Sequence, residues 1–97
     1  MADYKNKLTD QLMEVIASLK TGEECYAFFE DVCTIKEMQD MSLRLETAIM
    51  LKEGQSYQKI SACIGASATT ISRVNKCLNY GSGGYKMAIE RLKGKED

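Results

Sequence analysis

The side chains that could carry out chemistry are few in this sequence. Histidine is absent from the 97 residues, which removes most catalytic triads and most zinc sites. The four cysteines, Cys25, Cys33, Cys63 and Cys77, form no CxxC pair, and their spacing predicts no metal cluster. Carboxylates are frequent in the first half, but no nucleophile arrangement or phosphate-binding loop accompanies them. We therefore expect no enzyme activity, no metal and no cofactor.

We interpret the cysteines as small buried apolar residues, with a redox or metal role as the alternative. Met1 is followed by Ala2, Asp3 and Tyr4 instead of a basic segment and an apolar stretch, so we expect no secretory signal. No apolar run approaches the roughly 18 residues of a membrane span. The protein is therefore predicted to be cytoplasmic, with no membrane partner.

Charge is distributed unevenly, although the net charge is only −1. Residues 1–55 carry six basic and eleven acidic side chains, whereas residues 56–97 carry seven basic and three acidic ones. No acid lies between Glu53 and Glu90. The acid-free half could bind a polyanion while the other half dimerises or faces solvent. A chance segregation of surface charge is the alternative.

The elements that must position these residues are expected to be helices, in a single all-α domain over residues 1–97. Hydrophobic residues make up 44%, close to the roughly 45–50% of globular chains. A first helix with one apolar stripe is predicted to end at Gly22. A second apolar stripe lies on a short helix that follows. The first stripe consists of Leu8, Leu12, Ile16 and Leu19, and the second of Cys25, Phe28, Phe29 and Val32.

A third helix is predicted from the capping box of Thr34 and Glu37 to Gly54, with an interruption near Asp40–Ser42. Its second half is apolar nearly all round, which is typical of a buried helix. The apolar residues are Leu43, Leu45, Ala48, Ile49, Met50 and Leu51. A short monomer has little protein to surround such a helix, so residues 1–53 are predicted to form a homodimer interface. A central helix in a monomeric bundle is the alternative.

Residues 56–79 fit a helix-turn-helix. Ser56 can cap a helix through Cys63, Gly65 can make the turn, and Ser67 can cap a helix from Ala68 to about Asn79. Apolar residues stand where the two helices would face each other, and small ones stand at the crossing and after the turn; they are Ile60, Ile64, Ile71, Val74, Ser61 and Ala66. A helical hairpin with no DNA role is the alternative.

The outward face of the second helix suits DNA. Its side chains are mostly short and polar, which permits close approach to the major groove, and Arg73 could bind a guanine or a phosphate. The predicted outward residues are Ser67, Ala68, Thr69, Ser72, Arg73 and Lys76. A merely solvated face is the alternative. After a glycine-rich joint at 81–84, a last helix is expected over 84–93, with Met87, Ile89 and Leu92 as its apolar positions and a frayed tail from Lys93.

Ile64-Gly-Ala-Ser-Ala-Thr-Thr-Ile-Ser-Arg73 resembles the recognition segment of the Trp repressor family. The stretch from Thr34 to Tyr80, with Asn79-Tyr80-Gly81 and Gly84-Tyr85, is similar to the YerC/YecD branch of that superfamily, over about residues 24–92. The resemblance implies an intertwined helical homodimer that binds double-stranded operator DNA. The residues it places at the major groove and phosphates are Lys59, Ser67, Ala68, Thr69, Thr70 and Ser72.

The resemblance also implies a position for a ligand. Arg44 and Arg73 match the two arginines that sandwich the indole of tryptophan in the Trp repressor, and Thr34 matches a threonine of that pocket. A pocket glycine is replaced by Val74 and a pocket serine by Cys77. The branched side chain of Val74 would occupy space that the ligand needs, so we predict that tryptophan is not the effector. The alternative role of Arg44 is a surface salt bridge with Asp40.

Together these patterns predict a sequence-specific transcriptional regulator, most simply a repressor, that acts as a homodimer without tryptophan. A dimeric helical module that binds other proteins is the alternative from another class. A regulator gated by another small molecule is a third interpretation.

Overall fold

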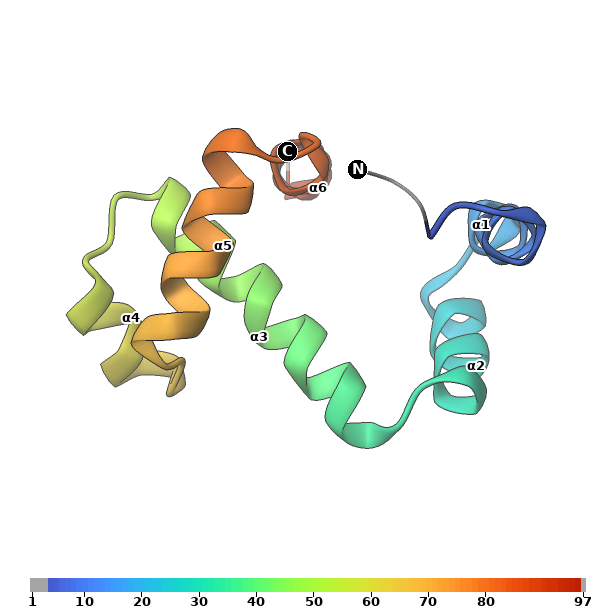
Figure 1. Cartoon of the computed structure of the whole chain (residues 1–97), viewed down its shortest axis with the longest axis horizontal. Coiled ribbons are helices and arrows are strands. Elements are labelled where there is room, and N and C mark those ends of the chain that lie inside the picture. Colours follow the sequence, from blue (N-terminus) through green and yellow to red (C-terminus); the bar gives the residue numbers. More distant parts are fainter. Residues whose placement is uncertain (1–3, 97) are drawn as a thin grey trace. The chain divides into compact units, whose positions relative to one another are not determined.

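The structure, a computed structural model, describes residues 4–96 and is helical in every regular element of that part of the chain. The six helices are α1 (Lys7–Ser18), α2 (Gly22–Val32), α3 (Ile35–Lys52), α4 (Tyr57–Ile64), α5 (Ala68–Tyr80) and α6 (Gly84–Glu96) (Figure 1). This confirms the predicted all-α class. The chain divides into two compact units, Met1–Met38 and Gln39–Asp97, with the boundary inside α3.

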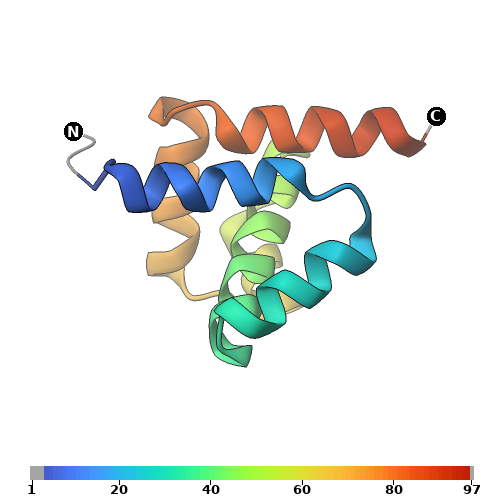
Figure 2. The same cartoon turned by 90° about the vertical axis from the view of Figure 1, so that its right-hand side faces the viewer.

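In the N-terminal unit, each of the first two helices begins at a side-chain cap. The Asn6 side chain accepts a hydrogen bond from the Thr9 backbone N–H at 3.0 Å. The Thr21 hydroxyl accepts one from the Glu24 N–H at 3.1 Å, and the Glu24 carboxylate accepts one from the Lys20 N–H at 2.8 Å. Figure 2 shows α1 (blue) and α2 (cyan) inclined to each other across the short connection.

The prediction that Gly22 ends the first helix is wrong. α1 ends at Ser18, and Gly22 is the first residue of α2. The reason is the Thr21 cap, whose hydroxyl pairs the Glu24 N–H, together with the Glu24 carboxylate, which pairs the N–H of Lys20 just before the cap. These bonds fix a helix start at Gly22.

The apolar stripes of the N-terminal unit are only partly covered. No residue of α1 or α2 is buried. Leu8 is 78% exposed, and Ile35, which follows α2 at the start of α3, is 79% exposed. Burying such side chains is worth roughly 1.5–3 kcal/mol each, so this unit offers an apolar surface without a partner of its own.

The third helix begins at the predicted capping box and continues without a break. The Thr34 N–H donates to the Glu37 carboxylate at 2.8 Å, and the Glu37 N–H donates to the Thr34 hydroxyl at 3.1 Å. The interruption expected near Asp40–Ser42 is wrong, because α3 is helical from Ile35 to Lys52. That stretch holds no proline or glycine that would break the helical hydrogen bonds.

The core of the C-terminal unit lies around the second half of α3 and consists of two clusters. In one, Ala48 packs with residues of α5 and α6; in the other, Met50 packs with residues of α4, α5 and the turn between them. The partners are Val74, Leu78 and Ile89 for Ala48, and Ile60, Ala66 and Ile71 for Met50. The predicted inward stripe of α5, Ile71, Val74 and Leu78, is therefore confirmed.

One buried polar group also lies on this part of α3. The Thr47 side chain is fully buried, and its hydroxyl donates to the Leu43 carbonyl at 2.7 Å. Leu45, which the sequence placed on the apolar side of the helix, is 37% exposed. The second half of α3 is thus buried on the side of Thr47, Ala48 and Met50 and still open at Leu45.

The last helix and the cysteines depart from expectation. α6 continues through Lys93 to Glu96, so the prediction of a frayed tail is wrong as far as Glu96. Asp97 lies outside the described residues. Ile89 is buried as predicted, but Met87 and Leu92 are about half exposed, at 49% and 48%. Cys25 and Cys33 are half-buried, whereas Cys63 and Cys77 are exposed, so no cysteine is a core residue of the single chain.

Candidate nucleic-acid interface

The first helix of the predicted motif, α4, has defined ends. The Ser56 hydroxyl accepts a hydrogen bond from the Lys59 N–H at 3.1 Å, as predicted for an N-cap. At the other end Gly65 takes φ 73°, a left-handed conformation that costs a residue with a Cβ roughly 1–2 kcal/mol. Its N–H donates to the Ser61 carbonyl at 2.9 Å. The chain therefore turns sharply after Ile64, where the motif requires it.

The second helix, α5, begins at Ser67. Its hydroxyl accepts a hydrogen bond from the Thr70 N–H at 3.1 Å and donates to the Thr70 hydroxyl oxygen at 3.1 Å. Behind this cap, the fully buried Ile60 and Ile71 join α4 to α5. Because the inner faces of both helices are packed, the direction of their outer faces is fixed.

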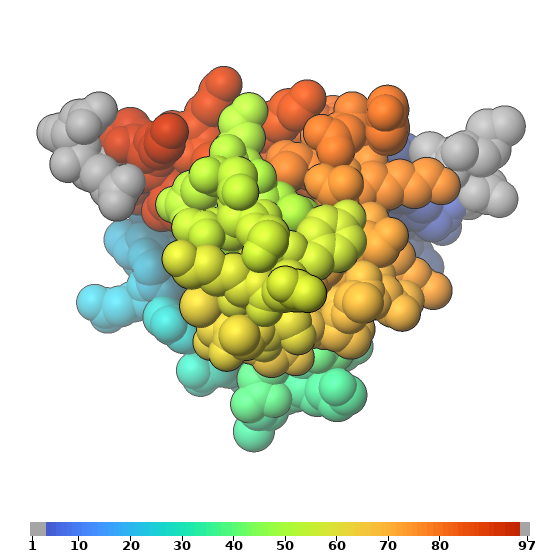
Figure 3. Space-filling model, turned by 90° about the vertical axis from the view of Figure 1, so that its left-hand side faces the viewer, coloured from blue at the N-terminus to red at the C-terminus, as the bar shows by residue number. Residues whose placement is uncertain are grey.

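The outer faces of α4 and α5 lie together on one face of the C-terminal unit, drawn from yellow-green to orange in Figure 3. Seven of the eight predicted DNA-binding residues are exposed, namely Lys59, Ser67, Ala68, Thr69, Ser72, Arg73 and Lys76. Thr70 is half-buried and takes part in the Ser67 cap. The structure thus brings the exposed set onto two adjoining helices, and their contact with DNA stays a prediction.

The charged side chains of residues 54–89 are all positive. Residues 54–89 contain no aspartate or glutamate. Lys59 on α4, Arg73 and Lys76 on α5, and Lys86 on α6 are all exposed. A phosphate that approached α4 or α5 would meet these cations and the positive ends of two helix dipoles, with no carboxylate from residues 54–89 to repel it.

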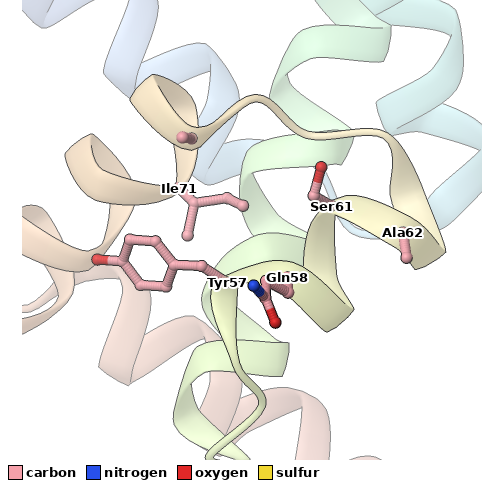
Figure 4. A pocket seen from close by; sticks show the side chains of 6 residues that line it. Tyr57, Gln58, Ser61, Ala62 and Ile71 are labelled. Atoms are coloured by element: carbon pink, nitrogen blue, oxygen red, sulfur yellow. The ribbon is translucent and has the colours of Figure 1, made fainter.

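A groove of about 430 Å³ lies between α4 and α5 and was not predicted from the sequence. It is lined by Tyr57, Gln58, Ser61 and Ala62 from α4 and by Ala68 and Ile71 from α5. Figure 4 shows the Tyr57 ring turned toward α5, close to Ile71. The signal that could have found it is the four-residue spacing of Tyr57 with Ser61 and of Gln58 with Ala62, which places each pair on one side of α4.

The two arginines of the possible ligand site line one small cavity of about 170 Å³. The rest of its lining is Thr70, Val74, Cys77 and Tyr85. Val74 is only 2% exposed and packs against Ala48, so its side chain forms the inner wall of the cavity. Thr34 belongs to the N-terminal unit, where it forms the capping box with Glu37. Binding of an effector here stays a prediction.

Residues 4–96 contain no group of three or more Cys, Asp or Glu side chains that could hold a metal ion. No helix among the same residues is long and apolar enough to cross a membrane.

Known proteins match this chain over most of its length. The family model described as Trp repressor protein matches residues 7–93. The uncharacterised protein YerC of Bacillus subtilis (strain 168) is 54% identical over 92 residues, which cover 95% of this chain and 88% of that protein.

Two solved structures of Trp repressor-like proteins have the same fold. The one from Staphylococcus aureus has a TM-score of 0.89 at 41% identity and covers 94% of this chain and 91% of its own. The one from Eubacterium eligens ATCC 27750 has a TM-score of 0.91 at 48% identity and covers 96% of each chain. The resemblance seen in the sequence, including its YerC branch, is confirmed. The chain belongs to the Trp repressor family, a family of DNA-binding regulators and not of enzymes.

Proposed function

We propose that this protein is a sequence-specific transcriptional regulator, a repressor, in which α5 enters the major groove of double-stranded DNA. The observation that carries the proposal is the exposed first turn of α5, formed by Ser67, Ala68 and Thr69 on a fully packed helix-turn-helix. Side chains this short let the helix backbone come close to base edges. A regulator of this kind acts in the cytoplasm, where the DNA of a bacterium lies.

The remaining exposed residues have separate roles in this proposal. Lys59 in the first turn of α4 binds a phosphate and contributes affinity without sequence preference. Arg73 is one and a half turns into α5 and binds a guanine edge or a phosphate. Thr70 acts through the cap that it forms with Ser67, since its hydroxyl is already hydrogen-bonded.

The regulator acts as a homodimer. The support is the uncovered apolar surface of α1 and α2, in which Leu8 and Val32 are 78% and 55% exposed. A second copy offers the same surface and can cover it, as an isologous interface does. Two helix-turn-helix units related by a two-fold axis then read two half-sites about 34–36 Å apart.

Selection of bound fragments from random duplex DNA tests the function directly. We expect enrichment of an inverted repeat with about one helical turn between half-site centres. Thr69→Glu places a carboxylate on the exposed first turn of α5 and should abolish the enrichment, while the matched Thr69→Ser should retain it. Recovery of unenriched random DNA by the wild-type protein would contradict the proposal.

A further inference from the structure

We propose that the groove between α4 and α5 receives the C5-methyl group of a thymine in the operator, an inference that rests on the proposed function. This interhelix groove is lined by Tyr57, Gln58, Ser61, Ala62, Ala68 and Ile71 (Figure 4). Its volume, about 430 Å³, leaves ample room for a methyl group and the adjoining edge of a base.

The groove has an apolar floor and opens toward the outer face of the motif. Ile71 is fully buried, whereas Ala62 and Ala68 are exposed, so the lining runs from the core to the surface. Tyr57 is 41% exposed and forms one side with its ring. Ala68 is the first residue of α5 and is followed by Thr69, so the opening is continuous with the surface proposed to meet the major groove.

The chemistry of the lining suits a thymine better than a phosphate. None of the six side chains is charged, so an anion would find no counter-ion within the groove. Alanine and isoleucine provide the apolar contact by which proteins read the thymine methyl group. Gln58 and Ser61 add an amide and a hydroxyl, which can donate hydrogen bonds to the thymine O4 beside that methyl.

The charge around the groove favours nucleic acid as the occupant. Lys59 follows Gln58 directly on α4 and is exposed, so a backbone phosphate bound there would bring a base edge toward the groove. Residues 54–89, which supply the whole lining, include no acid. An acidic segment of another protein could pair with Lys59, but its carboxylates would find no cation in the uncharged groove.

Deoxyuridine substitution tests the inference, because deoxyuridine is thymidine without the methyl group. In the duplex selected by the wild-type protein, each thymine is replaced in turn and binding is measured by fluorescence anisotropy. We expect one position in each half-site at which the replacement weakens binding about three- to fivefold, as loss of one buried methyl group does.

Two variants locate the effect. Ala62→Leu fills the groove with a side chain that α4 accepts at an exposed position, and it should remove the difference between thymine and deoxyuridine. Lys59→Ala should weaken binding of both duplexes while their ratio stays that of the wild type.

The possible failures can be told apart. If the wild-type protein binds the selected duplex but no deoxyuridine replacement changes the affinity, the groove assignment is overturned and the proposed function stands. Discrimination that persists in Ala62→Leu would also overturn it, since the methyl group would then lie elsewhere. If no duplex is bound at all, the proposed function itself fails and the groove assignment fails with it.

Discussion

Ser67 and Thr70 are joined twice at the start of α5. The Ser67 hydroxyl accepts a hydrogen bond from the Thr70 backbone N–H and donates one to the Thr70 side-chain oxygen, both at 3.1 Å. The first bond satisfies a backbone donor that the helix cannot pair itself, and the second orients both hydroxyls. The first turn of the helix proposed to read DNA is therefore held in place before DNA arrives.

Replacement of the Ser67 cap should lower the stability of the protein. Ser67→Ala removes both hydrogen bonds and should lower the free energy of unfolding by about 1 kcal/mol. Ser67→Asn retains an N-cap acceptor and should keep most of that stability. Urea denaturation measures the difference. Equal unfolding free energies for wild type and Ser67→Ala would contradict the role of the cap.

Lys59→Ala should weaken binding to all DNA sequences alike. Loss of one phosphate contact reduces the slope of log Kobs against log salt by about 0.9. The control is Lys20→Ala, which removes an equal charge from the connection between α1 and α2. Anisotropy titrations on selected and random duplexes from low to high salt measure both. A slope that is unchanged in Lys59→Ala, or changed equally in Lys20→Ala, would show that the phosphate contact is assigned to the wrong residue.

Leu8→Asp should dissociate the proposed homodimer. Leu8 is 78% exposed in the single chain, so its replacement removes little contact within the chain, but burying a carboxylate there under a second apolar surface is costly. Ala17→Asp, also exposed on α1 but on the side away from the apolar stripe, is the matched control. Sedimentation equilibrium should give a dimer for the control and a smaller or unfolded species for Leu8→Asp. A folded wild-type monomer at micromolar concentration would exclude the dimer.

The unmodified protein should not bind L-tryptophan. Val74 is 2% exposed, packs with Ala48, Leu78 and Ile89, and lines the small cavity of Arg44 and Arg73, so an indole placed there would compete with its side chain for space. Overpacking of this kind costs roughly 1–3 kcal/mol, a ten- to hundredfold loss of affinity. Isothermal titration calorimetry should record no binding heat. Micromolar affinity for tryptophan would overturn the prediction.

Local chemistry explains why the helix-turn-helix was predictable. Ser56, Gly65 and Ser67 act through hydrogen bonds and dihedral angles of their immediate neighbours, so their types and spacing suffice to place α4 and α5. The prediction at Gly22 was wrong, because the Thr21 cap and the Glu24 carboxylate start a helix at the position where a glycine alone suggests an end.

Features that depend on packing between distant segments were not predictable in the same way. The groove beside Tyr57 is lined by residues of both α4 and α5, so the spacing along α4 indicates one wall of it and not the position of the other helix. Cys63 and Cys77 were expected in the core but are exposed, since burial depends on which face of a helix is covered and not on residue type. The exposed site residues were predictable because they follow from the buried stripe of α5.

Substitution of Thr69 shows whether the outer face of α5 binds DNA. Affinity of the wild-type protein for its selected duplex is measured beside Thr69→Glu and Thr69→Ser, after equal folding of all three is established by circular dichroism. We expect tight, salt-dependent binding by the wild type and by Thr69→Ser, and a loss of affinity of at least tenfold in Thr69→Glu. Equal affinity of all three proteins for the duplex would contradict it.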